Sequence, residues 1–285
     1  MASLLDLRRR IRATESTQQL TKAMHTVAAS KLRKAQDRII GARPFAQLMQ
    51  RVLSHLSSAT ETTADPLLAS PIVPDAPVLL FVVTADKGLC GSFNSSLLRK
   101  AHSFLEDSDV DVSFGLVGRR GRDHFSRRKT EILFERINFF NSLSPSDAQE
   151  MARVAIEHYA SGKVSGVSII YNEFKNVMQQ EVVVEQLLPI PEPEGNAGEL
   201  SADYLYEPDP QVILNDLVPR HIETQLFRVL LESDAAFLAA QMTAMDAASK
   251  NAGEMIDELT LRMNKLRQAA ITRELIEVVS GADAL

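Results

Sequence analysis

The last third of the chain carries an apolar repeat that is typical of one very long helix. The repeat advances by steps of three and four residues: Leu231, Ala235, Leu238, Met242, Met245, Ser249, Ala252, Ile256, Leu259, Met263, Leu266 and Ala270. This spacing is the seam of a coiled coil. Asp209 can cap the helix and Pro210 suits its first turn. The sequence therefore predicts a helix of about 70 residues, roughly 105 Å long at 1.5 Å per residue.

The first segment shows the same spacing. Its seam is apolar in one half: Ala28, Leu32, Ala35, Ile39, Ala42, Ala46, Met49, Leu53 and Leu56. The same frame then passes through polar residues and returns to apolar ones: His25, Thr21, Gln18, Thr14, Ile11, Leu7 and Leu4. We expect a second long helix over residues 1–57, with a kink at Pro44 because proline removes a backbone donor.

Charge is distributed unevenly between the two ends of the chain. Residues 1–56 hold eleven basic and three acidic residues, whereas residues 207–285 hold seven basic and thirteen acidic ones. A basic segment suggests nucleic acid or an acidic partner. Because no aromatic residues interleave the basic ones for base stacking, pairing with the acidic last segment or with another protein is favoured over nucleic acid.

The middle of the chain alternates strand-like and helix-like segments, which argues for a small α/β domain with a mostly parallel sheet. We place it at residues 76–192, between a Ser/Thr/Pro/Ala linker at 57–77 and a second linker at 189–200. The helix beginning near residue 146 can be capped by Ser146 or Asp147. The predicted class is α/β: an antiparallel coiled coil of the segments 1–57 and 208–285, plus a small Rossmann-like α/β domain.

A glycine-containing loop, TADKGLCGSFN, follows the first apolar strand at residues 84–94. Strand, glycine turn and helix is the layout of phosphate-binding loops. The loop nevertheless matches neither the Walker A spacing nor the dinucleotide fingerprint. A tight turn with Asn94 or Ser95 near the helix cap is therefore favoured, and a nucleotide-binding α/β enzyme using residues 86–94 remains the alternative. Cys90 lacks an evident histidine partner, so catalysis by its thiolate is disfavoured.

Other candidate sites are weaker. The six histidines are scattered without a metal-ligand spacing, so no metal or cofactor is expected. The arginine-rich stretch at 119–129 can contact RNA, but a solvated helix face is the preferred interpretation. A single cysteine excludes an intrachain disulfide. Neither a membrane-spanning stretch nor a secretory signal is expected.

Four motifs, in this order, resemble the gamma subunit family of F-type ATP synthases over nearly the full length. They are TQQLTKAMHTVAASKLRKAQDR at 17–38, TADKGLCGSFN at 84–94, DYLYEPDP at 203–210 and NKLRQAAITRELIEVVSGADAL at 264–285. The resemblance implies a non-catalytic rotor with no cofactor and one copy per complex. Its coiled coil enters a ring of alpha and beta subunits, and its α/β domain lies near the epsilon subunit and the c ring.

The resemblance also implies where the partners touch this chain. Residues toward the alpha and beta ring are Lys22, Met24, Lys87, Cys90, Arg267, Gln268, Ile271 and Thr272, and residues toward epsilon and the c ring are Tyr204, Tyr206 and Glu207. By the same resemblance, Arg267 and Gln268 hydrogen-bond to a polar site on the beta subunit, called the catch. Residues 271–285 enter an apolar collar at the top of the alpha and beta ring. The implied location is peripheral, at the cytoplasmic face of a bacterial inner membrane.

Two features depart from the family pattern. Pro219 lies inside the expected last helix, which predicts a bend or a late start there. The single cysteine also means that the paired-cysteine insert of the light-regulated plastid form is absent. The resemblance therefore implies a bacterial-type subunit without a thiol switch.

Overall fold

A computed structural model describes residues 3–59, 67–68, 71–108, 110–128, 130–138, 140, 143–191, 207 and 209–283. The chain forms two compact units, which are described separately. The first unit joins residues 1–29 to residues 241–285, and the second comprises residues 30–240. Two long helices contribute to both units.

These helices are α1, Leu4–Ala59, and α5, Pro210–Asp283, of 56 and 74 residues. Both continue through a proline. Pro44 lies on the exposed side of α1, as does Ile40, the residue whose carbonyl group a proline at position 44 cannot bond. The expected late start of α5 at Pro219 is wrong, because the helix already begins at Pro210.

Asp209 caps α5 as predicted. Its Oδ1 accepts a hydrogen bond from the backbone N–H of Gln211 at 2.8 Å. This bond satisfies one of the donors that the first turn of a helix leaves free. From this capped start, α5 runs as a single helix to Asp283.

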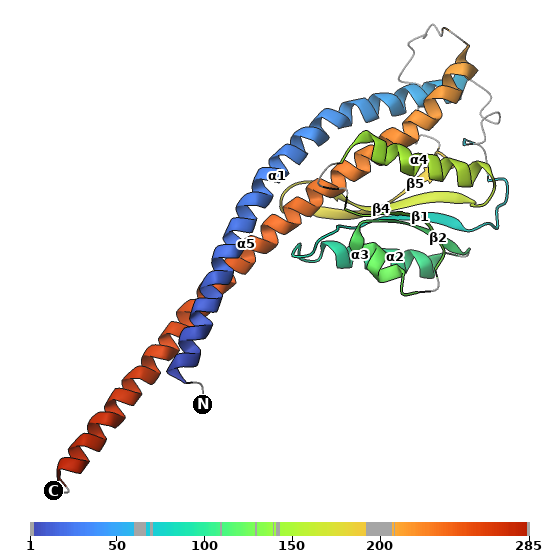
Figure 1. Ribbon diagram of the computed structural model, residues 1–285. Coiled ribbons are helices and arrows are strands. Elements are labelled where there is room, and N and C mark those ends of the chain that lie inside the picture. Colours follow the sequence, from blue (N-terminus) through green and yellow to red (C-terminus); the bar gives the residue numbers. More distant parts are fainter. Residues whose placement is uncertain are drawn as a thin grey trace. The chain divides into compact units, whose positions relative to one another are not determined.

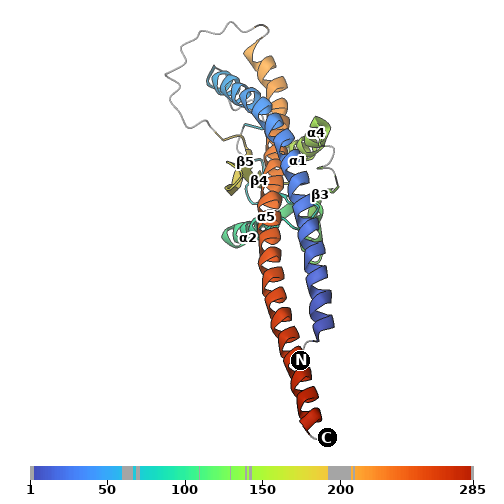
Figure 2. The same cartoon turned by 90° about the vertical axis from the view of Figure 1, so that its left-hand side faces the viewer.

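The first unit is a two-helix coiled coil with a partly polar seam. Leu7, Thr21 and Ala28 of α1 are buried there, as are Met245 and Ala252 of α5. Figure 2 shows the first turns of α1 beside α5, and the last turns of α5 extending beyond the N-terminus. The predicted frame of both seams is therefore confirmed in this unit.

The polar part of this seam makes a specific contact between the helices. The Gln18 side-chain amide donates to the Ser249 carbonyl oxygen at 3.3 Å. A Cβ added at Gly253 would lie 3.0 Å from Gln18 Nε2, so the glycine leaves room for the amide. Small and polar residues thus bring the two backbones close together without a continuous apolar interface.

The second unit contains a five-stranded sheet of order β3-β2-β1-β4-β5. The strands are β1 Val78–Val83, β2 Val112–Val117, β3 Ile132–Arg136, β4 Gly166–Phe174 and β5 Gln180–Leu188. All neighbours are parallel except β4 and β5, which form an antiparallel pair. β1 reads VLLFVV and is almost entirely buried, as expected for a central strand covered on both faces.

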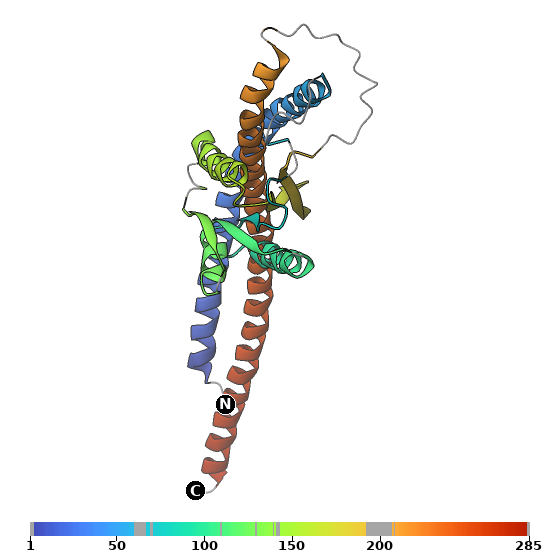
Figure 3. The same ribbon diagram turned by 90° about the vertical axis from the view of Figure 1, so that its right-hand side faces the viewer.

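Helices cover both faces of this sheet. α2, Phe93–Asp107, and α3, Arg119–Phe125, lie on one face, and α4, Pro145–Ala160, lies on the other (Figures 1 and 3). The predicted cap of α4, Ser146 or Asp147, lies two or three residues too late. Ser144 is the N-cap, and its side chain and that of Asp147 form a reciprocal capping box.

The first turns of α5 pack within the same unit. Leu214, Val218, Ile222 and Leu226 recur every four residues and are buried. This stripe belongs to the core of the second unit, so α5 serves two purposes along its length. Its beginning completes the α/β unit, and its end forms the coiled coil.

Candidate functional site

The glycine-containing loop lies at the topological switch point of the sheet. β1 has β2 on one side and β4 on the other, both parallel to it. The loop at residues 84–92 leaves the carboxyl end of β1, and β4 ends at Phe174 on the same edge. In doubly wound folds the crevice at this position is where nucleotides bind. The geometry therefore tests the nucleotide-binding alternative directly.

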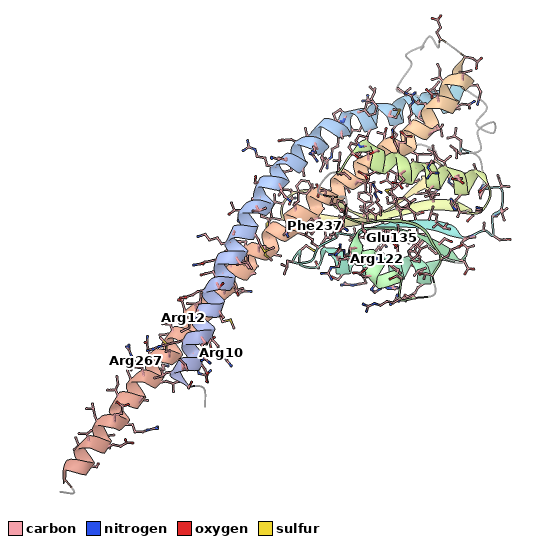
Figure 4. All side chains as sticks on the ribbon, in the orientation of Figure 1. Arg10, Arg12, Arg122, Glu135, Phe237 and Arg267 are labelled. Carbon is pink, nitrogen blue, oxygen red and sulfur yellow. The ribbon has the colours of Figure 1, made fainter. Side chains whose placement is uncertain are left out.

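Helix α5 of the same unit occupies this edge of the sheet. The Phe237 ring meets the Phe93 ring edge to face, with centroids 5.7 Å apart. Five residues earlier, Glu232 accepts the backbone N–H of Phe174, at the end of β4, at 3.1 Å. Figure 4 labels Phe237 on α5 beside the sheet. The crevice is thus filled by the protein's own helix.

Backbone donors around the loop are also already used. Asn94 Oδ1 accepts the N–H of Ala85 at 2.9 Å, and Asn94 Nδ2 donates to the Lys87 carbonyl at 3.3 Å. The Asp86 carboxylate accepts the N–H groups of Arg119 and Asn138 at 3.0 and 2.9 Å. A phosphate would compete with this carboxylate for the same donors. The loop is therefore a tight turn held by hydrogen bonds, which is the interpretation that the sequence favoured. The alternative of a nucleotide-binding enzyme is not supported.

The capping arrangement differs from the expected one. Ser92 is the N-cap of α2, while Asn94 reaches back into the loop and holds it. Ser95 instead donates to the Ser92 carbonyl at 2.9 Å. Asn94 therefore fixes the loop shape rather than the helix end.

The tip of the loop presents an apolar side chain. Leu89 has a φ of 62° and is 63% exposed. A left-handed backbone at a leucine is uncommon and costs energy, so the surrounding hydrogen bonds must hold it. Lys87 beside it is exposed. Together with Gly91 and Ser92, these two side chains form the exposed part of the loop that another molecule can touch.

Cys90 lies beneath this tip. Its side chain is buried, and Asn94 Nδ2 is 3.3 Å from its sulfur. Burial raises the pKa of the Cys90 thiol, against smaller opposing effects of Asn94 and Arg120. The thiol is therefore neutral at physiological pH and supports the loop from inside, which excludes its use as a reactive thiolate.

The other predicted contact residues lie in the first unit, except for Tyr204, Tyr206 and Glu207. Lys22 is exposed on α1 and Met24 is half-buried. On α5, Arg267, Gln268, Ile271 and Thr272 are all exposed. Figure 4 labels Arg267 on α5, and Arg10 and Arg12 in the first turns of α1.

The end of α5 exposes an apolar surface. Ile271, Leu275, Ile276, Val278 and Val279 are between 49% and 70% exposed. Within the described residues, nothing covers the side chains of 271–280, since every one of them is exposed. Contiguous exposed apolar residues of this kind mark an interaction site.

The third predicted group can be examined only in part. Tyr204 and Tyr206 lie outside the described residues. Glu207 is described and exposed. The role of all three remains a prediction.

One side-chain cluster was not predicted. His102 of α2 and His124 of α3 meet with their Nε2 atoms 2.9 Å apart, and Arg128 Nη1 lies 2.7 Å from His102 Nε2. Packing of α2 against α3 brings these residues together, and no sequence spacing signals it. No set of three potential metal ligands occurs in the described part of the chain.

The arginine-rich stretch is largely engaged with its own unit. Arg122 is within ion-pair distance of Asp123 at 2.8 Å and of Glu135 on β3 at 3.6 Å (Figure 4). Arg119 donates to the Asn138 side chain at 2.9 Å. These contacts agree with the helix-face interpretation rather than with an RNA site. Among the helices described, none has the length and apolarity needed for a membrane span.

Comparison with known proteins agrees with the architecture. A family model described as ATP synthase matches residues 3–285. The ATP synthase gamma chain of Chloroherpeton thalassium is 45% identical over 301 aligned residues, and that of Solibacter usitatus is 46% identical over 289; each alignment covers all of this chain and 99% of the relative.

Solved structures show the same fold. A chain of the Tetrahymena thermophila mitochondrial ATP synthase central stalk and c ring aligns with a TM-score of 0.61 and 27% identity, covering 81% of this chain and 99% of that one. A chain of the Euglena gracilis mitochondrial ATP synthase aligns with a TM-score of 0.66 and 17% identity, covering 99% and 94%. With a full-length family match, near-complete relatives and the observed architecture in agreement, this chain belongs to the ATP synthase gamma chain family.

Proposed function

We propose that this chain is the central-stalk rotor of an F-type ATP synthase and does no chemistry itself. It couples ion flow through a membrane c ring to the conformational cycle of catalytic beta subunits. The observation that carries the proposal is the continuous 74-residue α5, which completes the α/β unit at its start and exposes apolar residues at its end. One element can thereby connect two distant sets of partners.

The proposed partners of the first unit are the alpha and beta subunits. The exposed apolar residues from Ile271 onward suit an apolar collar, because their burial there is favourable. Arg267 and Gln268 supply exposed donors for a catch on beta. Such charge-assisted hydrogen bonds are directional and can form and break as the shaft turns. Lys22 and Met24 are the proposed contacts on α1.

The proposed contact of the second unit with beta is the glycine-containing loop. Exposed Lys87 suits an ion pair with an acidic segment of the beta subunit. The exposed Leu89 side chain adds an apolar contact beside it. Cys90 then acts as the buried support of this contact. Tyr204, Tyr206 and Glu207 are the proposed contacts with epsilon or the c ring. The complex would contain one copy of this chain and lie peripherally at the cytoplasmic face of a bacterial inner membrane.

A native-mass measurement tests this function. A tagged copy of the chain is purified with its partners, and the ATPase rate of the product is measured. We expect one copy bound to a hexamer of two alternating nucleotide-binding subunits, with ATPase activity. A free monomer that binds nucleotide or nucleic acid by itself would contradict the rotor function.

The catch assignment has its own test. We expect Arg267→Ala combined with Gln268→Ala to weaken the coupling between ATPase and ion transport in the assembled complex. Arg262→Ala, which removes one exposed charge from the same helix, is the matched control. Unchanged coupling in the double variant would refute the catch assignment but not the rotor function.

A further inference from the structure

Two ion-pair clusters connect α5 to the sheet of the second unit. In the first, called the Arg43 joint, Arg43 of α1 donates from Nε and Nη2 to the two Glu232 oxygens at 3.0 and 3.1 Å. Arg43 Nη2 also donates to the Phe174 carbonyl at 3.1 Å, and Glu232 accepts the Phe174 N–H at 3.1 Å. Two side chains and one backbone unit therefore join α1, α5 and β4.

The second cluster, called the Arg228 joint, lies one helical turn earlier on α5. Arg228 Nη2 lies 2.7 Å from both oxygens of Glu185 on β5, and Nη1 donates to the Tyr171 hydroxyl of β4 at 3.1 Å. The Tyr171 hydroxyl in turn donates to Glu185 at 3.0 Å. Burial alone would lower the pKa of Arg228, but Tyr171 and Glu185 outweigh it and the pKa is raised. The guanidinium therefore stays charged.

Each joint has one partner that is largely buried and one that is partly exposed. The Glu232 side chain is 2% exposed and that of Arg228 is 19% exposed, against 42% for Arg43 and 30% for Glu185. Around them α5 packs through aliphatic residues such as Leu226, Leu230 and Leu231. Apolar contact is non-directional and roughly proportional to the area buried. It holds the helix against the sheet but resists sliding or rotation of the helix only weakly.

Charge-assisted hydrogen bonds supply the missing directionality. A guanidinium bonded to a carboxylate has a fixed planar geometry, so displacement of either partner breaks bonds that water can replace only poorly at buried Glu232 and Arg228. Buried ion pairs add little to net stability compared with well-packed apolar residues. Their presence at this interface is therefore better explained by the geometry they impose.

We propose that the Arg43 and Arg228 joints are the positions through which torque passes between the α/β sheet and the long helices. This inference rests on the proposed rotor function, in which the c ring turns the α/β unit and the head resists through the coiled coil. Outside these contacts, the covalent path between sheet and helices runs through residues 60–77 and 189–209. The joints bypass that path, because they connect strands β4 and β5 directly to α5.

The test is the torsional stiffness of the rotor in the assembled complex. The head is fixed to a surface and stalled, a probe is attached to the c ring, and the angular fluctuation of the probe is recorded. Glu232→Gln keeps the size of the side chain but removes its charge. Because neutral hydrogen bonds are about half as strong as charge-assisted ones and the Arg228 joint stays intact, we expect the angular variance to rise measurably, by less than about twofold.

A milder variant keeps the proposal testable if Glu232→Gln does not fold. Arg228→Lys retains the positive charge but not the planar fork, and should raise the variance to a smaller extent. The control is Glu157→Gln on α4, whose ion pair with Arg153 lies within one helix and is more than 60% exposed on both sides. Its variance should equal that of the unmodified complex.

The outcomes separate the two proposals. Angular variance equal to the control, in complexes that assemble and hydrolyse ATP, would overturn the torque-transmitting role while leaving the rotor function intact. Failure of the unmodified chain to join any ATPase head would overturn the rotor function itself. A rise in variance without a fall in melting temperature of the complex would show that the joints act on stiffness rather than on stability alone.

Discussion

His102 Nε2 on α2 lies 2.9 Å from His124 Nε2 on α3. A hydrogen bond at this distance requires that one nitrogen carries a proton and the other a lone pair. Burial lowers the pKa of both imidazoles, and the neighbouring Arg128 lowers each of them further. Both imidazoles are therefore neutral near pH 7. Protonation of both rings would place three cationic groups together, because Arg128 lies beside them.

The first prediction concerns the titration of this pair. In the unmodified chain both imidazoles should titrate below the ordinary histidine pKa of about 6.5. Arg128→Gln removes the adjacent positive charge and should raise the pKa of both, although burial should still keep them below that value. Histidine ring signals followed by NMR between pH 4.5 and 8 check this. Arg153→Gln is the control, and equal shifts in the two variants would contradict the assignment.

The second prediction concerns acid destabilisation by His221. Its Nδ1 is buried with no hydrogen-bond partner among the described residues, and it faces Glu185 and Arg228. Burial lowers the pKa of His221 to about 4 from 6.5. The unfolded chain therefore takes up the proton first, so stability is complete above pH 6.5 and is lost as the pH falls toward 4.

Between pH 7 and pH 5 the loss from this one group should be about 2 kcal/mol in the free energy of unfolding. Urea unfolding of the chain at the two pH values measures it. His221→Leu should remove most of this pH dependence whatever its effect at pH 7. An unchanged pH dependence in that variant would show that other groups cause it.

The third prediction concerns Asp234, whose ionisation lowers the stability of the fold at neutral pH, whereas protonation of His221 lowers it at acid pH. Burial raises the pKa of Asp234 on α5 to about 6, although Arg38 and Lys31 of α1 lower it in part. A folded pKa above the unfolded one means that the ionised carboxylate destabilises the fold at pH 7; this cost begins to fall as the pH drops through 6 and disappears only below 3.8, where the unfolded chain is protonated too. Asp234→Asn should therefore increase the free energy of unfolding by about 3 kcal/mol at pH 7.5.

The same substitution should bring a smaller gain of about 1.5 kcal/mol at pH 5, where native Asp234 is mostly protonated but its carboxyl in the unfolded chain is still ionised, and almost none near pH 3. Asp246→Asn is the matched control on the same helix. Its hydrogen bond from Lys250 lowers the pKa of Asp246, so its replacement should bring no gain at either pH. Equal effects of the two substitutions would refute the burial argument.

The fourth prediction concerns the turn that follows β2. Gly118 has a φ of 89°, and a Cβ there would lie 1.9 Å from the Thr84 carbonyl oxygen. Gly118→Ala should therefore lower the free energy of unfolding by about 3 kcal/mol or more, through both strain and the clash. Gly41→Ala is the control, because nothing lies within 4 Å of its Cβ position in α1. That variant should gain about 0.5–1 kcal/mol.

The seams and the mostly parallel sheet follow from local patterns in the sequence, whereas the strand order does not. Steps of three and four residues identified the buried side chains of α1 and α5, and the apolar run at Val78–Val83 identified a central strand. Periodicity reports which face of an element is covered, so these features could be predicted.

Contacts between distant elements were not accessible in this way. His102 and His124 meet only because α2 packs on α3, and Arg43 reaches Glu232 across 189 residues of sequence. The exposure of Leu89 was also missed, because it depends on a left-handed backbone in a loop that Asn94 holds through the Lys87 carbonyl. Single side chains in three dimensions set these contacts, and no spacing rule reports them.

The exposed end of α5 has a consequence for how the complex assembles. Residues 271–283 are helical, but those whose exposure is described, 271–280, bury nothing in their own chain, and an isolated helix of about this length is marginal in water. In the proposed rotor, the ordering of this end would be completed by the partners that cover its apolar side chains. Binding and local folding become one event, so part of the interaction energy is spent on conformational entropy, and the chain acquires its final stiffness only inside the assembled machine.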